Sequence, residues 1–278
     1  MERQKRIVAI HDISCFGRCS LTVALPIISA AGIETSIIPT AILSTHTGGF
    51  TGFTYRDLTE DILPIVKHWK SLNLEFDAVY TGFLGSFEQI DIVCEAIDIL
   101  KTENTRIIVD PVMADHGQLY KIFPANFPEG MKKLCKKADI IMPNMTEAVF
   151  LLDEPYKTGP YEPEYIENIL KKLSQFANQV VLTGVYFDEE NLGAASYDKT
   201  TDKISYSFSK KINQFYHGTG DVFGSALTAA IVNQNTLEKA IDIAVKFTAQ
   251  SIQRSYDAQT DPRCGVNFEE GLEDLLKL

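Results

Sequence analysis

Apolar runs of strand length alternate with segments of helical periodicity along most of this chain, and no other feature constrains its fold as strongly. Arg6–Ile10 is predicted as a strand, Ser20–Ala31 as a helix that stops at Gly32, and Glu34–Pro39 as the next strand. Further strands are expected at Ala78–Thr81, Arg106–Val109, Asp139–Met142 and Gln179–Thr183, and further helices at Leu58–Leu72, Glu88–Lys101, Gly130–Lys137, Thr146–Leu152 and Pro163–Phe176. Repeated strand–helix–strand units with short connections are typical of a mostly parallel sheet with helices on both faces. The predicted class is therefore α/β.

The pattern changes once, near the C-terminal third. Ala194–Tyr197 and Lys203–Phe208 alternate with a period of two around Asp198–Asp202, which predicts a small antiparallel hairpin. Three helices are expected after it, at Asp221–Asn233, Leu237–Ser255 and Phe268–Leu278. Because no internal repeat, low-complexity tract or Pro/Gly/Ser-rich linker interrupts the chain, we expect one domain over residues 1–278.

Charge and composition exclude several classes of function. The 26 basic and 37 acidic residues give a formal net charge of −11, which would repel nucleic acid and anionic membranes. No run of about 18 apolar residues is present, so no membrane span is expected, and the first apolar run is too short for a signal peptide. Five scattered cysteines do not form a disulfide framework. The expected location is the cytoplasm.

The strongest chemical signal is the segment His217–Gly224, which opens a predicted helix. Gly218 and Gly220 around Thr219 would let backbone N–H groups converge on an anion, and the helix dipole would add to that field. Asp221 would then lie beside the same anion, placed to accept a proton from an approaching hydroxyl group. This arrangement suits phosphoryl transfer. The alternative is a loop that ends in a helix-capping residue.

Two further segments follow predicted strands and carry carboxylates. Asp110 ends one strand and is followed by a proline, whereas Asn144 and Glu147 lie between the next strand and a helix. Ligands of such sheets bind beyond the carboxyl ends of the strands, so these side chains would form a plausible Mg²⁺ site. The alternative for Asn144 and Glu147 is a variant of the helix capping box.

The N-terminal third supplies a possible second pocket. Asp12 follows the first strand, Ser44–Phe53 is a glycine-rich loop with aromatic residues, and Phe83 follows another strand. Small polar groups with aromatic rings suit a flat, polar-edged ring better than a flexible sugar. His11 with Cys15 and Cys19 matches no standard zinc spacing.

Two nucleotide-binding motifs are missing. The chain has no Gly-x-x-x-x-Gly-Lys-Ser/Thr, which excludes a P-loop mechanism, and no Gly-x-Gly-x-x-Gly after its first strand. Backbone amides, a metal ion and Lys210 or Lys211 would therefore have to neutralise the negative charge of the phosphate groups.

The combined motifs resemble the signature set of the ribokinase-like superfamily. They are Gly218-Thr-Gly-Asp221, Asp110-Pro-Val-Met113 and Pro143-Asn-x-x-Glu147, in the expected order over nearly the whole chain. The Gly82–Gln89 run, the Thr45–Gly48 loop and the chain length resemble the pyridoxal/pyridoxamine kinase branch.

The resemblance implies ATP-dependent phosphorylation of the 5′-hydroxymethyl group of vitamin B6 compounds, with Mg²⁺, often a monovalent cation such as K⁺, and typically a homodimer. It implies Asp221 as the catalytic base, the Gly218–Gly220 segment with Thr219 as the anion hole, and Asp110 and Glu147 as residues near the metal. The remaining expected contacts are Asp12, His46, Thr47, Gly48 and Phe83 for the vitamer, and Asp110, Asn144, Glu147, Thr183 and Gly184 for ATP.

Two departures from the branch pattern leave details open. Many members have Ser where this chain has Asp12, and many have a Lys where it has Gly184 after Thr183. The first leaves the preferred vitamer open, and the second leaves open which cation faces the nucleotide. Hydroxymethylpyrimidine kinase is the nearest alternative, a sugar kinase is more remote, and a non-catalytic protein that binds B6 or a nucleotide is a third reading.

Overall fold

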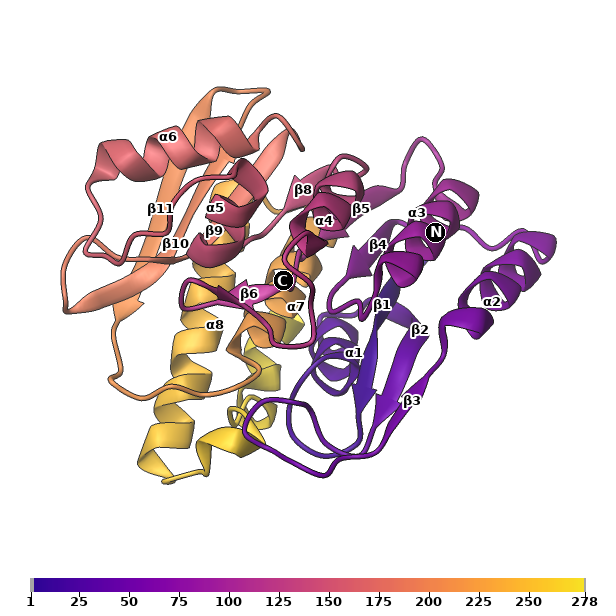
Figure 1. Cartoon of the computed structure of the whole chain (residues 1–278), viewed down its shortest axis with the longest axis horizontal. Helices are drawn as coiled ribbons and strands as arrows, with labels where there is room; N and C mark the ends of the chain where they lie inside the picture. Colours follow the sequence, from indigo (N-terminus) through magenta and orange to yellow (C-terminus); the bar gives the residue numbers. More distant parts are fainter. Residues whose placement is uncertain (1–2, 278) are drawn as a thin grey trace.

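The strands predicted from the apolar runs join one nine-stranded sheet in the computed structural model, which describes residues 3–277. Its order is β11-β10-β9-β8-β5-β4-β1-β2-β3 (Figure 1). The strands are β1 Arg6–Ser14, β2 Glu34–Leu43, β3 Tyr55–Asp57, β4 Ala78–Thr81, β5 Arg106–Val109, β8 Ile140–Ile141, β9 Gln179–Val185, β10 Asn191–Asp198 and β11 Lys203–Lys210. The run from β9 to β2 is parallel, whereas β3, β10 and β11 pair antiparallel at the two edges.

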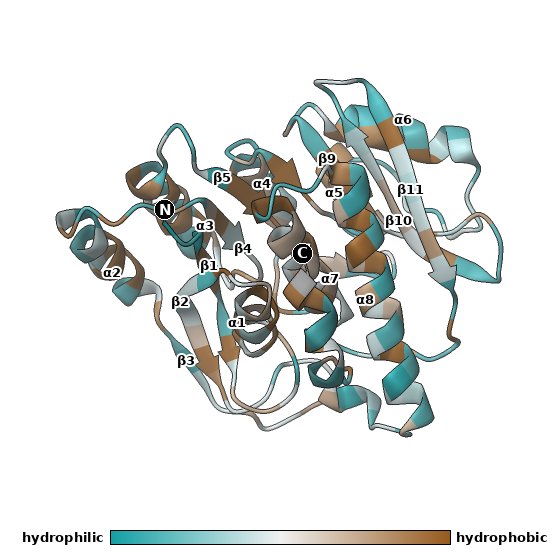
Figure 2. Cartoon of the chain, turned by 180° about the vertical axis from the view of Figure 1, so that it is seen from behind, coloured by the Kyte–Doolittle hydropathy of each residue, from teal (hydrophilic) through white to brown (hydrophobic). Residues whose placement is uncertain are grey.

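Helices cover both faces of the sheet, which explains why Ile7–Ile10 in β1 are fully buried without alternation. On one face pack α1 Leu21–Ala30, α7 Thr219–Val232 and α8 Leu237–Asp257; on the other pack α2 Thr59–Ser71, α3 Phe87–Leu100, α4 Phe127–Cys135, α5 Met145–Leu152 and α6 Pro163–Leu173. Figure 2 shows the first of these layers in front, with polar and apolar stretches alternating along α8. The predicted α/β class is confirmed. Within residues 3–277, no helix combines the length and the hydrophobicity needed to cross a bilayer.

The antiparallel hairpin is present as β10 and β11, but it extends the main sheet. A second, separate hairpin that was not predicted consists of β6 Ala114–Asp115 and β7 Gln118–Leu119. The predicted terminal α-helix is wrong in type, because Glu269–Lys277 forms the 3₁₀ segment η2, and Leu278 lies outside the described residues. Gly271 disfavours an α-helix there, and its Cα lies against the Arg254 guanidinium.

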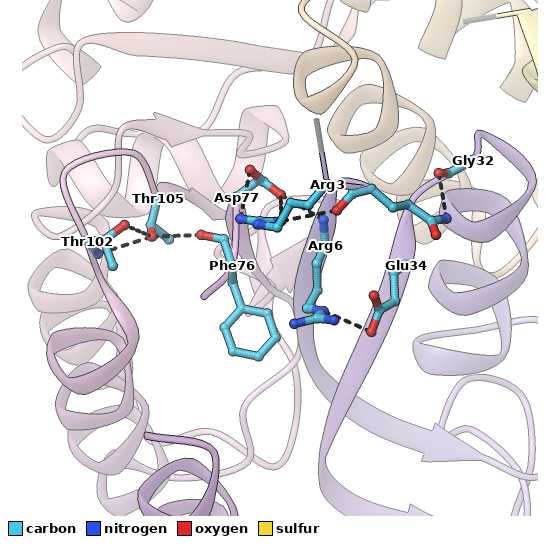
Figure 3. A network of polar contacts seen from close by, with 9 residues as sticks. Arg3, Arg6, Gly32, Glu34, Phe76, Asp77, Thr102 and Thr105 are labelled. Atoms are coloured by element: carbon cyan, nitrogen blue, oxygen red, sulfur yellow. Dashed lines mark hydrogen bonds and ion pairs between the residues drawn. The ribbon is translucent and has the colours of Figure 1, made fainter. Parts of the chain in front are cut away.

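Polar contacts connect the amino ends of the central strands, whereas the predicted site lies at their carboxyl ends (Figure 3). Asp77 accepts hydrogen bonds from the Arg3 guanidinium at 2.8 Å and from the backbone N–H of Arg6 at 2.7 Å. Thr105 Oγ1 donates to the carbonyl of Phe76 at 2.8 Å. Long loops follow the carboxyl ends of β1 and β2. The loops after β1 and β2 meet the C-terminal segment at the bottom of Figure 1.

Candidate functional site

A cavity of about 420 Å³ lies at the carboxyl ends of β5, β8 and β9 and at the start of α7. The predicted residues that line it are Asp110, Asn144, Glu147, Thr183, Gly184, Gly218, Thr219, Gly220 and Asp221. Lys210 and Lys211 line it from the end of β11. The structure thus brings together every residue predicted for the nucleotide, the anion hole and the base.

The start of α7 has the geometry of an anion site. Gly218 is its N-cap with φ 75°, and a Cβ there would collide with the carbonyl oxygen of Arg18. Gly220 faces open space, because a Cβ there would meet nothing within 4 Å. The N–H groups of a first helical turn lack partners within the helix, so this turn can donate to a negatively charged group in the cavity.

Asp221 is half-buried on the wall of this cavity, in the first turn of α7. Burial raises its pKa to about 7, and the negative charge of Asp12 raises it further, whereas the backbone N–H of Ser20 acts in the opposite direction. A carboxylate with a pKa close to neutrality is suited to accept a proton from a hydroxyl group.

Asp110 and Glu147 are buried carboxyl groups on the same wall. Burial raises the pKa of Glu147 to about 8. Its oxygens accept from the backbone N–H groups of Met113 at 3.1 Å and Asn144 at 2.8 Å. Asn144 Oδ1 accepts in turn from the N–H of Glu147 at 2.9 Å, so the predicted capping box is present. Burial, Glu147 and Asp221 all raise the pKa of Asp110.

The donor set fits a magnesium ion that is shared with phosphate. In the described part of the chain, no three His, Cys, Asp or Glu side chains gather closely enough to hold a metal ion by themselves. However, Asp110 has two carboxyl neighbours whose charge would be relieved by a divalent cation. Mg²⁺ commonly takes one or two protein carboxylates and completes its shell with water and phosphate oxygens.

Asp12 lies where the pairing of β1 with β2 is irregular, between His11 and Ile13. Its carboxylate accepts from Ser20 Oγ at 2.6 Å and from Ser14 Oγ at 3.1 Å. Burial raises its pKa, although both hydroxyl groups oppose that shift. Ser20 therefore binds Asp12 through its hydroxyl, and its backbone N–H lowers the pKa of Asp221, so Ser20 lies between Asp12 and the predicted base.

The loop after β2 places His46 with both ring nitrogens engaged. Nδ1 accepts from the N–H of Gly48 at 3.1 Å, so Nε2 carries the proton and donates to the carbonyl of Arg263 at 2.6 Å. A Cβ on Gly48 would lie 2.5 Å from the His217 ring. Thr47 is exposed on this loop. His46 therefore offers a ligand only its ring surface.

Phe83 follows β4 and packs against Phe123 with ring centroids 5.7 Å apart and ring planes tilted by 33°. None of the five vitamer-side residues, Asp12, His46, Thr47, Gly48 and Phe83, lines the 420 Å³ cavity, so the predicted site has two parts that meet near Asp221 and Ser20.

Ser20, whose hydroxyl binds Asp12, and Tyr55, whose pKa the charge of Asp12 affects, were not predicted as site residues. Ser20 has a φ of 56°, which is uncommon for a residue other than glycine and marks a position under conformational constraint. Tyr55, on the edge strand β3, has its pKa raised to about 12 by burial and by the charges of Asp57 and Asp12. The sequence signal for Ser20 was its position before a helix, whereas nothing in the sequence pattern indicated Tyr55.

Comparisons with known proteins give the family and the folds to which this chain is similar. Residues 25–264 match the family model described as phosphomethylpyrimidine kinase. A protein from Bacteroides thetaiotaomicron with the provisional name phosphomethylpyrimidine kinase was crystallised with pyridoxal; it is 36% identical, with a TM-score of 0.92 over 99% of this chain and 96% of that one. Pyridoxal kinase from Lactobacillus plantarum is 27% identical, with a TM-score of 0.90 over 98% and 97% of the two chains. Pyridoxal kinase of Dictyostelium discoideum is 27% identical over 86% of this chain and 84% of its own length.

Proposed function

We propose that this chain, which belongs to the phosphomethylpyrimidine kinase family, phosphorylates the 5′-hydroxymethyl group of vitamin B6 compounds with ATP, releasing the 5′-phosphate and ADP. The observation that carries the proposal is the position of Asp221. It lies on the wall of the cavity that holds the predicted anion site, and Ser20 lies between it and Asp12 on the vitamer side. We further propose that residues 1–278 act as a single kinase domain, because β1–β5 and β8–β11, from both halves of the chain, share one sheet.

In the proposed reaction, the hydroxymethyl oxygen attacks the γ-phosphorus of ATP while the bond from that phosphorus to the ADP oxygen breaks, and Asp221 accepts the hydroxyl proton. The N–H groups at the start of α7 would stabilise the charge on the transferred phosphoryl group. Asp110 and Glu147 would hold Mg²⁺, which supplies positive charge to the phosphates when bound. Lys210 lines the cavity beside Lys211, whose ammonium group already pairs with Glu189 at 2.9 Å. We therefore propose Lys210 as the cation that faces the nucleotide in the absence of a lysine at Gly184.

Two observations favour a B6 compound as the acceptor. The vitamer side is bordered by aromatic rings, among them Phe83 and the Tyr55 ring near Asp12, which suit a flat heteroaromatic ring. The Bacteroides relative was crystallised with pyridoxal. The second candidate is hydroxymethylpyrimidine, which the name of the matching family favours. Both acceptors present a hydroxymethyl group on a nitrogen-containing ring.

A coupled assay of ADP release with four separate acceptors tests the function. Pyridoxal, pyridoxamine, pyridoxine and hydroxymethylpyrimidine would each be added to the same enzyme and ATP. We expect the highest kcat/KM with one of the three B6 compounds. Turnover with hydroxymethylpyrimidine alone would assign the second candidate, and binding without turnover of any acceptor would indicate a non-catalytic protein.

The pKa of Asp221 predicts how activity depends on pH. Because the base must be ionised and its pKa is raised to about 7, kcat/KM should rise with pH up to about 7 and then level off. On the acid side it should fall about tenfold per pH unit. A profile that stays flat from about pH 6 to 8 would show that Asp221 does not act as the base in the free enzyme.

Asp12 predicts a preference between vitamers. A charged carboxylate can pair with the amine of pyridoxamine more strongly than a serine hydroxyl can. We expect Asp12→Ser to leave kcat for pyridoxal nearly unchanged and to lower kcat/KM for pyridoxamine by about 1–2 kcal/mol. The observed contacts with Ser14 and Ser20 also suit a purely structural role. An equal loss of kcat/KM with both substrates, or no loss with either, would favour the structural role.

A further inference from the structure

Three consecutive carbonyl groups near the C-terminus each bind a different loop of the site. The carbonyl of Pro262 accepts from the N–H of His217 at 3.2 Å, and that of Cys264 accepts from the N–H of Arg18 at 3.1 Å. Between them, the carbonyl of Arg263 accepts from His46 Nε2 at 2.6 Å. Residues 261–265 thus connect the segment before the anion hole, the turn before Ser20 and the loop after β2.

The side chain of Arg263 adds a contact to the same loop. Its guanidinium carbon lies 5.4 Å from the centroid of the Phe50 ring, a cation–π arrangement. The guanidinium also pairs with the Asp261 carboxylate, with Nη2 and Oδ2 2.7 Å apart. A Cβ on Gly49 would lie 2.9 Å from Arg263 Cγ, so the loop backbone lies directly against this side chain.

The loop itself has few other anchors. At its base, Ser44 N–H donates to the Thr54 carbonyl at 3.2 Å, and Ser44 Oγ accepts from Thr54 N–H at 2.9 Å. Between these two residues, the ring of Phe50 contacts His46, Phe16 and Arg263 and is only half-buried. A segment with so little buried surface opens at low free-energy cost unless particular contacts hold it.

We propose that residues 261–265 form a latch, in which Arg263 holds the 44–53 loop closed over the acceptor through Phe50. The inference rests on the proposed kinase function. A closed loop keeps water away from the γ-phosphorus. When it opens, a water oxygen can form the new bond to that phosphorus while the bond to the ADP oxygen breaks, and the proton of the water passes to Asp221. The products are then ADP and inorganic phosphate, and the acceptor remains unphosphorylated. Arg263 is therefore a positioning residue.

The test compares Arg263→Gln with Arg3→Gln in the full chain. Arg3 is a matched control, because it also pairs with an aspartate, Asp77, but lies at the opposite edge of the sheet (Figure 3). The first measurement is the rate of chymotrypsin cleavage after Phe50 and Phe53. We expect Arg263→Gln to be cut about threefold faster than the wild type, as the loss of an exposed cation–π contact implies, and Arg3→Gln at the wild-type rate.

The second measurement is the ratio of ADP to phosphorylated acceptor, which should be close to one in the wild type and in Arg3→Gln and should rise in Arg263→Gln. Arg263→Lys retains a cation, so its cleavage rate and its product ratio should both lie closer to the wild-type values. Phe50→Leu removes the other partner, and the double variant should show no further change beyond either single variant.

Equal cleavage of Arg263→Gln and Arg3→Gln, or an unchanged product ratio in Arg263→Gln, would overturn the latch. A wild-type protein that phosphorylates no acceptor would instead contradict the proposed function. The cleavage rates would still decide whether Arg263 holds the loop, because they require no turnover.

Discussion

Replacing Asp221 with asparagine is expected to remove most of the phosphoryl transfer while both ligands still bind. The amide has nearly the same shape as the carboxylate, but it cannot take the proton of the hydroxymethyl group. Loss of a general base commonly lowers the rate by about 10²–10⁴-fold. We therefore expect kcat to fall by that factor, with dissociation constants for pyridoxal and an ATP analogue within about twofold to threefold of the wild type.

The matched control is Asp98→Asn. Asp98 lies on α3 outside the cavity, and its exposed carboxylate pairs with Lys137 at 2.6 Å. The same change of charge should therefore leave kcat near the wild-type value. Calorimetric titrations would give the two dissociation constants, and single-turnover measurements would give the chemical step. A near-native kcat in Asp221→Asn would remove this residue from the mechanism.

The second large effect is expected at Gly218, where an alanine should destabilise the whole fold. The residue has a φ of 75°, and an added Cβ would collide with the carbonyl oxygen of Arg18. The left-handed conformation alone costs an L-residue roughly 1–2 kcal/mol, and backbone of another loop cannot move aside cheaply. We expect Gly218→Ala to lower the free energy of unfolding by roughly 3 kcal/mol.

Gly220→Ala, two residues along the same turn, is the control. Because a Cβ there meets no atom within 4 Å, the free energy of unfolding should change by less than about 1 kcal/mol. The added methyl group would instead occupy space above the anion site and raise KM for ATP. Urea unfolding of the wild type, Gly218→Ala and Gly220→Ala gives the free energy of unfolding of each protein. Equal stability of the two variants would mean that the contact between Gly218 and Arg18 does not constrain the fold.

The parallel core of the sheet could be predicted closely because it is buried on both faces. Ala78–Thr81 and Arg106–Val109 have the predicted bounds, since each is an apolar run ended by polar or turn residues. The edge strand β3 was missed because all of its residues, Tyr55–Asp57, are exposed and carry no hydrophobic signal. The strands β6 and β7 have two residues each, too few for any periodicity.

The two groups of predicted site residues also differed in how well the sequence could predict their positions. The resemblance to ribokinase-like kinases is confirmed by the family match over residues 25–264. The residues predicted for the nucleotide could be placed close together from the sequence because Asp110, Asn144 and Asp221 each follow a strand or begin a helix, so local order in the sequence fixes their position. The arrangement of the residues predicted for the vitamer depends on contacts between distant segments. His46 and Arg263 are 217 residues apart, and no periodicity predicts that they meet.

The most direct measurement of the proposed function is a competition between pyridoxal and hydroxymethylpyrimidine for limiting ATP. Equal concentrations of both acceptors would be incubated with the enzyme and Mg²⁺, and the two phosphate esters would be quantified by mass spectrometry. The product ratio equals the ratio of the two kcat/KM values, so it is independent of the amount of active enzyme. We expect pyridoxal 5′-phosphate to predominate by at least about tenfold, which corresponds to about 1.4 kcal/mol of discrimination. Predominance of hydroxymethylpyrimidine phosphate would contradict the assignment of a B6 compound as the acceptor.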